Sequence, residues 1–143
     1  MKRSAIQICI LIFAFAITAF IAKAQTQGDE ELVKQCLENY MSGDGNRVEK
    51  AFDASATMKY IDAATGEFKD VAIAEYIARV KANTNKTERK IEIVYSAIEG
   101  TAAQARIRIE TDKFIIFDCM NLLKIKGEWK IVSKIFSRKN KQQ

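Results

Sequence analysis

The chain has 143 residues, of which 48% are hydrophobic and 29% charged; it contains no proline, and its formal net charge is +5. This composition is typical of a globular protein and excludes the disordered and fibrous classes. The length predicts one domain, which can bury a sufficient core without a structural metal or disulfide.

The N-terminal stretch MKRSAIQICILIFAFAITAFIAKAQ has the three parts of a secretory signal peptide. Lys2 and Arg3 precede a long apolar run, and Ala22-Lys23-Ala24 fits the small-x-small cleavage rule. We therefore expect residues 1–24 to be a signal peptide, and the protein to be exported and periplasmic or secreted. The alternative is an uncleaved membrane anchor, because the apolar run is of borderline length for a spanning helix.

The remaining residues, 25–143, are expected to form a single domain. Loss of the three basic residues of the signal peptide would leave 20 basic residues of the 23 against 18 acidic ones, a net charge of +2. Nucleic-acid binding usually requires a concentrated basic face, so no nucleic-acid partner is expected. Membrane contact is expected only if the N-terminal segment is not cleaved.

The mature chain keeps two of the three cysteines, Cys36 and Cys119. An oxidising compartment permits a disulfide between them. Both also lie within apolar patterns, where a free cysteine behaves as a small core residue. Both interpretations stay open, because the sequence does not give the distance between the two Cα atoms.

Helical spacing of apolar residues predicts a first helix over Glu30 to Met41. The glycines of SGDGN, residues 42–46, end this helix, and Asn46 is a candidate cap for a short second helix that ends near Phe52.

A short β-hairpin and a third helix follow. A strand is predicted over Thr57 to Ile61, and Phe68 begins its brief partner. Asp70 is then a candidate N-cap for a helix over Val71–Lys81, whose apolar residues lie on one stripe.

Strands dominate the second half of the chain. In TAAQARIRIE the apolar residues alternate with polar ones, among them Arg106 and Arg108, which predicts a strand with one buried and one exposed face. KIEIVYSAI precedes this strand, and FIIFDCMNLLKI and EWKIVSKIF follow it. Helices followed by an antiparallel meander predict an α+β fold.

The last two strands are joined at Lys126-Gly127, a two-residue turn signal. Ile125 then lies opposite Glu128, and continuing this register places Asp118 opposite Ile135. The drier side of this hairpin, expected to face the helices, carries Asp118, Met120, Leu122, Trp129, Ile131, Ser133 and Ile135. The mixed side carries Phe117, Cys119, Asn121, Leu123, Ile125, Lys130, Val132, Lys134 and Phe136. A bulged turn would swap the faces.

Asp118 is the most informative residue of this register. A carboxylate on the apolar side of a central strand costs several kcal/mol unless it is protonated or hydrogen-bonded. Such a group is a candidate for a functional site. The structural alternative is an acid that accepts a hydrogen bond from a tyrosine hydroxyl or a backbone amide.

The order of elements, with AFDASATMKYID in the first half and Asp118 followed by NLLKIKGEWKIVSKIF in the second, resembles the nuclear transport factor 2-like superfamily. More narrowly, it is similar to small exported bacterial proteins described as putative lumazine-binding or SnoaL-like. The resemblance implies a cone-shaped fold, in which N-terminal helices pack in the concave face of a curved, mainly antiparallel sheet. It also implies a pocket at the open end and a homodimer formed through the sheet.

Enzymes with this fold offer a test of chemistry. In the ketosteroid isomerases, the stretch that FDASATMKY resembles ends in a catalytic aspartate, whereas this chain has Tyr60 there. A phenol, with a pKa near 10, is a poor base at neutral pH. The chain also has no histidine, which excludes Ser-His and Cys-His pairs and histidine metal sites. We expect no catalytic residue, cofactor or metal.

The function that we predict is that of a non-enzymatic, exported protein that binds a small, largely apolar molecule as a homodimer. Sites of this kind are mostly apolar with a few placed polar groups. The residues expected to line the site are Tyr40, Tyr60, Tyr76, Asp118, Met120 and Ser133, supported by Trp129 and Ile131. Two alternatives are an isomerase or dehydratase that uses Asp118 with a tyrosine, and a dimeric interaction scaffold whose cone is filled by its own side chains.

Overall fold

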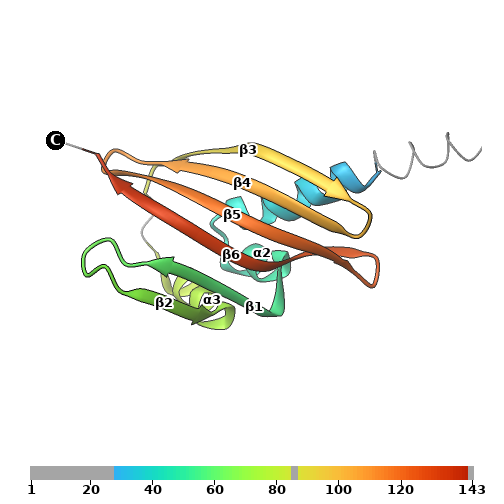
Figure 1. Ribbon diagram of the computed structural model, residues 1–143, viewed down its shortest axis with the longest axis horizontal. Coiled ribbons are helices and arrows are strands. Elements are labelled where there is room, and N and C mark those ends of the chain that lie inside the picture. The colour runs from blue at the N-terminus through green and yellow to red at the C-terminus, as the bar shows by residue number, and fades with distance from the viewer. Residues whose placement is uncertain (1–27, 85–86, 142–143) are drawn as a thin grey trace, which may run out of the picture. The chain divides into compact units, whose positions relative to one another are not determined.

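The computed structural model describes residues 28–84 and 87–141 (Figure 1). The chain divides into two compact units, Met1–Glu31 and Leu32–Gln143. In the first unit the described residues, 28–31, are helical. The predicted signal peptide lies outside the described residues. Within the described part of the chain, no helix has the length and apolarity needed to cross a membrane.

The second unit is built on a curved, six-stranded sheet with the strand order β2-β1-β6-β5-β4-β3 (Figure 1). The antiparallel meander predicted for the second half of the chain is confirmed. β1 is antiparallel to β2 and parallel to β6, so the first strand pair joins the meander through its last strand. The strands are β1 (Phe52–Ile61), β2 (Phe68–Ala72), β3 (Lys90–Glu99), β4 (Ala102–Glu110), β5 (Phe114–Ile125) and β6 (Glu128–Asn140).

Helices cover one face of this sheet, which we call the inner face; the opposite one is the outer face. In the second unit they are the helix over residues 32–41, α2 (Gly45–Ala51) and α3 (Ile73–Ala82). The core between helices and sheet consists of apolar side chains with almost no exposed surface, among them Leu37, Val48, Ile73, Ile107, Leu122 and Ile131. The α+β fold with helices on a curved sheet is thus the predicted one.

Two predicted helix caps are wrong. α2 is capped by Asp44, whose Oδ1 accepts hydrogen bonds from Asn46 N at 3.0 Å and Arg47 N at 2.9 Å. Asp70 does not cap α3, because β2 continues through it and its carboxylate instead binds the Lys59 ammonium across the β1–β2 pair. α3 begins after Ala72 without a side-chain cap.

The β5–β6 turn is the predicted two-residue turn. Lys126 and Gly127 have φ angles of 51° and 88°, and Ile125 pairs with Glu128. Two consecutive positive φ angles define a type I′ turn, whose twist matches that of the flanking strands. Leu122 also pairs with Ile131, so the predicted register holds for the half of the hairpin nearest the turn.

A β-bulge at Val132 changes the register in the other half. Asn121 pairs with Ser133, so β6 has one extra residue, and Asp118 pairs with Phe136 instead of Ile135. The extra residue reverses the faces of the strand beyond it. Ser133 and Ile135, predicted on the inner side, therefore lie on the outer face, where Ile135 is 52% exposed.

Lys134 is the residue most affected by the bulge. Its position was predicted on the mixed outer side, but it points inward opposite Met120 and is only 4% exposed. The turn sequence carries no information on a bulge five residues away, so the register prediction was wrong at this point.

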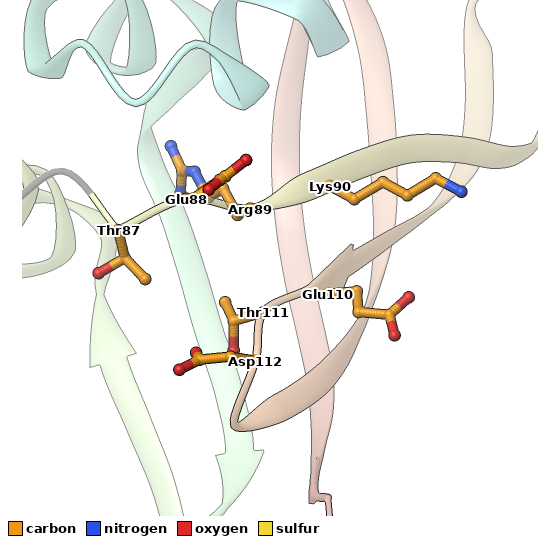
Figure 2. Close-up of a pocket in the computed structure, with 7 residues that line it drawn as sticks. All are labelled: Thr87, Glu88, Arg89, Lys90, Glu110, Thr111 and Asp112. Carbon is orange, nitrogen blue, oxygen red and sulfur yellow. The ribbon is translucent and has the colours of Figure 1, made fainter.

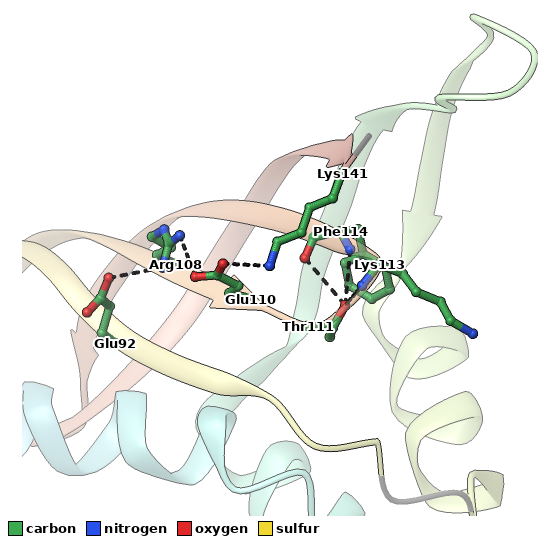
Figure 3. Close-up of polar contacts among 7 residues, drawn as sticks. All are labelled: Glu92, Arg108, Glu110, Thr111, Lys113, Phe114 and Lys141. Atoms are coloured by element: carbon green, nitrogen blue, oxygen red, sulfur yellow. Dashed lines mark hydrogen bonds and ion pairs between the residues drawn. The ribbon is translucent and has the colours of Figure 1, made fainter. Parts of the chain in front are cut away.

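The outer face of β3 and β4 carries a row of ion pairs (Figure 3). Arg108 lies 3.5 Å from a Glu92 oxygen and 2.5 Å from a Glu110 oxygen, and Lys141 lies 2.7 Å from the other Glu110 oxygen. The hydrogen bonds from Lys141 and Arg108 lower the pKa of Glu110. The outward direction predicted for the Arg106–Arg108 row is confirmed.

The two cysteines of the described chain are free thiols. Cys36 is buried, and its Sγ donates to the Ala51 carbonyl at 3.4 Å. Burial raises the pKa of Cys36 to about 11. Cys119 is exposed on the outer face of β5, so of the two interpretations left open, a disulfide or two core thiols, a core position holds only for Cys36.

Candidate functional site

Three polar side chains from different elements meet inside the second unit. Asp118 of β5 lies between Tyr40, at the end of the first helix, and Lys134 of β6. The Tyr40 hydroxyl donates to Asp118 Oδ2 at 2.5 Å, and Lys134 Nζ lies 3.0 Å from Oδ1. We call these residues the buried triad, because Asp118 is 0%, Lys134 4% and Tyr40 5% exposed.

Lys134 lies in a box of aromatic side chains. Its Nζ is 5.3 Å from the centre of the Tyr40 ring, 5.0 Å from that of Tyr76 and 4.8 Å from that of Phe136. The sulfur of Met58 lies 3.9 Å away on the β1 side. Aromatic faces attract a cation, most strongly where water is excluded. The box therefore compensates part of the desolvation of the ammonium group.

The two carboxylate oxygens of Asp118 have different partners. Among the described residues, Asp118 Oδ1 has no hydrogen bond of good geometry and depends on the nearby Lys134 ammonium. Burial raises the pKa of Tyr40 well above its usual value near 10, and the negative charge of Asp118 acts in the same direction. The phenol therefore stays protonated and donates permanently to the carboxylate.

This geometry bears on the enzyme alternative. The Asp118–tyrosine contact on which proton transfer would depend is present. However, Asp118 has no exposed surface, and both of its oxygens are engaged by Tyr40 and Lys134. A general base must come within hydrogen-bond reach of the proton that it removes. In this structure the carboxylate supports its neighbours and has no surface for a substrate.

The inner face opens to solvent beyond the triad. Along β6 exposure increases from Lys134 through the partly exposed Phe136 to the exposed Arg138. Phe136 stacks on Tyr60 of β1, with ring centres 4.5 Å apart and planes at 26°. Both rings are partly exposed, as is Tyr76 of α3. We call Tyr60, Tyr76 and Phe136 the aromatic patch.

The eight predicted lining residues fall into three groups. Tyr40, Tyr76 and Asp118 surround Lys134, and Tyr60 lies beside them through its stack on Phe136. Ser133 lies on the outer face, which corrects its predicted orientation. The other three, Met120, Trp129 and Ile131, belong to the buried core. Whether any of them contacts a ligand stays a prediction.

Two residues of this region were missed in the sequence. Lys134 and Phe136 had been placed on the outer side, because the register was extended without the bulge. The lysine appears in a segment, VSKIF, whose alternation is interrupted. That interruption is the one signal that could have indicated a bulge at this position.

Two other carboxylates, Asp53 and Asp62, have structural roles. Asp53 Oδ1 accepts from Ser55 N at 2.9 Å and from the Ser55 hydroxyl at 2.5 Å. Asp62 Oδ1 accepts from Ala64 N at 2.9 Å and Thr65 N at 3.0 Å. These hydrogen bonds lower the pKa of both carboxyls. Within the described ranges, no group of three or more cysteine and acidic side chains is placed to hold a metal ion.

A hollow of about 410 Å³ lies elsewhere, between the segment leading into β3 and the β4–β5 turn (Figure 2). Thr111 is its buried residue, but its hydroxyl accepts hydrogen bonds from Lys113 N and Phe114 N in the turn (Figure 3). Ligand sites are mostly apolar, and this hollow is lined by charged and threonine side chains. The lining residues are Thr87, Glu88, Arg89, Lys90, Glu110, Thr111 and Asp112, none of which was predicted.

Comparison with solved structures defines the class of protein as NTF2-like. An NTF2-like protein of unknown function from Shewanella baltica OS155 is 27% identical, with a TM-score of 0.71 over 78% of this chain and 94% of that one. A similar protein from Methylobacillus flagellatus KT is 28% identical, with a TM-score of 0.67 over 76% and 90%. A de novo designed protein with a curved β-sheet, 12% identical, shares the fold, with a TM-score of 0.56 over 78% and 98%.

The family can be stated more narrowly. The family model described as putative lumazine-binding matches residues 24–137, and the chain belongs to this family. No curated protein matches the sequence significantly. The superfamily and the family inferred from the sequence are confirmed, and the description of the family suggests a domain that binds a small molecule.

Proposed function

We propose that the protein is an exported, non-enzymatic binder of a small, largely apolar molecule. The observation that supports this most directly is the aromatic patch. Tyr60 and Phe136 on the face that the helices cover, and Tyr76 of α3, are partly exposed, although large apolar side chains between helices and a sheet are mostly buried. A flat apolar molecule placed on these rings would bury surface that is now in contact with water.

The buried triad gives the patch a rigid base. Lys134 is held by Asp118 on one side and by the rings of Tyr76 and Phe136 on the other. Buried polar groups that are paired in this way fix the side chains around them. The two patch residues that contact Lys134 are thus positioned before any ligand arrives, which lowers the entropic cost of binding.

The non-enzymatic character is proposed from the same geometry. Asp118 is enclosed, and the raised pKa of Tyr40 keeps its phenol protonated and makes it a weak acid. Conversion of this pair into a catalytic site would require the Asp118–Lys134 ion pair to open. The family description suggests binding and mentions no reaction.

The partner that we propose for the outer face is a second copy of the chain. Phe117 is 37%, Leu123 41% and Ile135 52% exposed there, on the two adjacent central strands β5 and β6. Edge and surface charges lie around them, as in the Glu92–Arg108–Glu110 row. Interfaces often combine an apolar centre with a polar rim. Ile135→Lys should then turn a dimer into a monomer in light-scattering measurements, and a parent that is monomeric at all concentrations would contradict the proposal.

The experiment that tests the proposed function is native mass spectrometry of protein purified without denaturation from its own source. We expect an additional mass of a few hundred daltons that is lost when the protein is denatured. The same spectrum gives the mature N-terminus, which we propose to be Gln25. Bare protein in every preparation, together with no binding from a library of aromatic small molecules, would contradict the function.

A further inference from the structure

The charges around the aromatic patch indicate which kind of molecule it binds. The inner face carries residues of alternate positions on each strand, and at the open end these are Met58 and Tyr60 on β1, Lys69 and Val71 on β2, Ile116 and Asp118 on β5, and Phe136 and Arg138 on β6. The only carboxylate among them is Asp118, which is enclosed and neutralised by Lys134.

Two cations remain at this end. Lys69 Nζ is paired with Glu67 at 2.6 Å. Arg138 is exposed, and its guanidinium lies over the ring of Phe114 at 4.1 Å from the ring centre. Within the described residues Arg138 has no carboxylate partner. The contact with the Phe114 ring holds the guanidinium in place, and the planar fork of its N–H groups matches a carboxylate.

From this arrangement we infer that the ligand is a flat aromatic carboxylate, with its ring on Tyr60 and Phe136 and its acid group on Arg138. Arg138 follows Phe136 by two residues on the same face of β6, so their Cα atoms lie roughly 7 Å apart along the strand. A bicyclic ring with one carboxylate spans this distance. This inference rests on the proposed function. The proposed function concerns the binding of a small molecule, and the inference specifies the charge of that molecule.

The experiment compares 2-naphthoate with 2-naphthamide, which has the same shape without the charge. Binding is measured by isothermal titration calorimetry on the parent chain and on Arg138→Gln, Arg138→Lys and Lys139→Gln. Lys139 is the matched control, because it is the next residue of β6, exposed, and on the outer face. Arg138 is exposed as well, so neither substitution removes a core contact.

We expect naphthoate to bind the parent at least about tenfold more tightly than naphthamide, as a charge-assisted contact would give. Arg138→Gln should remove this preference, Arg138→Lys should keep only part of it, and Lys139→Gln should keep all of it. Equal binding of both compounds, unchanged in Arg138→Gln, would overturn the inference and leave the proposed function standing. Failure of both compounds to bind the parent would contradict the inference and the placement of the site on the patch together.

Discussion

Replacement of Lys134 by methionine removes the ammonium from the buried triad and keeps a flexible side chain of similar length. Asp118, which has no exposed surface, would then be a buried carboxylate with the Tyr40 hydroxyl as its remaining partner. We expect Lys134→Met to fold and to be strongly destabilised, because a charge left unpaired in the interior has lost both its hydration and its counter-ion.

The magnitude follows from the contacts. Removal of one partner from a buried ion pair lowers the free energy of unfolding by about 3–5 kcal/mol. This figure includes the loss of the contacts between the ammonium and the three rings. For a domain of this size, 1 kcal/mol shifts the melting temperature by roughly 4 °C. The variant should therefore melt roughly 12–20 °C below the parent. Substitution of Asp118 by asparagine in the same variant should recover much of the loss, with a coupling energy of about 2–3 kcal/mol.

The assay is equilibrium unfolding in urea, followed by the fluorescence of Trp129, which is 5% exposed in the folded chain. Lys139→Met is the control, since it makes the same substitution at an exposed position of the same strand, and its effect should stay within about 0.5 kcal/mol. If Lys134→Met is as stable as Lys139→Met, or if the double variant loses the sum of both single effects, the Asp118–Lys134 ion pair is not formed in solution.

Three further predictions concern the same region. Tyr40→Phe should cost about 1.5–3 kcal/mol at neutral pH, because a hydrogen bond to a charged acceptor is lost. The pKa of Tyr40 is raised in the folded state, so its contribution to stability is complete below pH about 10, the pKa of an unfolded tyrosine, and decreases as the pH rises above it. The free energy of unfolding in urea should therefore decrease less at alkaline pH for Tyr40→Phe than for the parent. An identical dependence on pH in both proteins would refute this. In the monomeric Ile135→Lys variant, where the outer face is uncovered, a disulfide-exchange reagent should label Cys119 quickly and the buried Cys36 only after unfolding. Cys119→Ser should abolish the fast phase, whereas two thiols of equal reactivity would argue against the burial of Cys36. Deletion of Val132 should abolish the cooperative unfolding transition, since it removes the bulge and turns Lys134 away from Asp118; a variant with parental stability would show that the register adapts.

The order of the elements was predictable because each has a strong local signal. The alternation in Ala103, Ala105, Ile107 and Ile109 comes from one buried face of β4, and all four are buried as expected. Lys126-Gly127 predicted its turn, because a type I′ turn requires two positive φ angles. These signals depend on residues that are close in the sequence.

The site was less predictable, because it depends on contacts between distant elements. Asp118 was identified from its place in an apolar strand, and its contact with a tyrosine was one of the alternatives considered. The partner Lys134 was not predicted, because a shift of one residue in the register turns a side chain to the other face of the sheet. Without the bulge, the lysine is assigned to the exposed face. Its burial becomes favourable only when the carboxylate of β5, the rings of α3 and β6 and the bulge are all in place.

The caps show the same limit on a smaller scale. Asn46 and Asp70 both have side chains that suit an N-cap. The structure places Asp44 at the start of α2 and gives Asp70 to a cross-strand ion pair with Lys59. In the first case a neighbouring aspartate caps the helix, and in the second a lysine on the paired strand binds the candidate cap. The sequence alone does not show which of these competing contacts forms.

Binding of a small molecule at the aromatic patch of the helix-covered face is tested most directly by backbone amide NMR during titration with 2-naphthoate. We expect the amide shifts of Tyr60, Phe136 and Arg138 to saturate together, with little change at Arg89 and Thr111 of the hollow between β3 and the β4–β5 turn. Shifts confined to the hollow, or no saturable shifts at the patch, would contradict it.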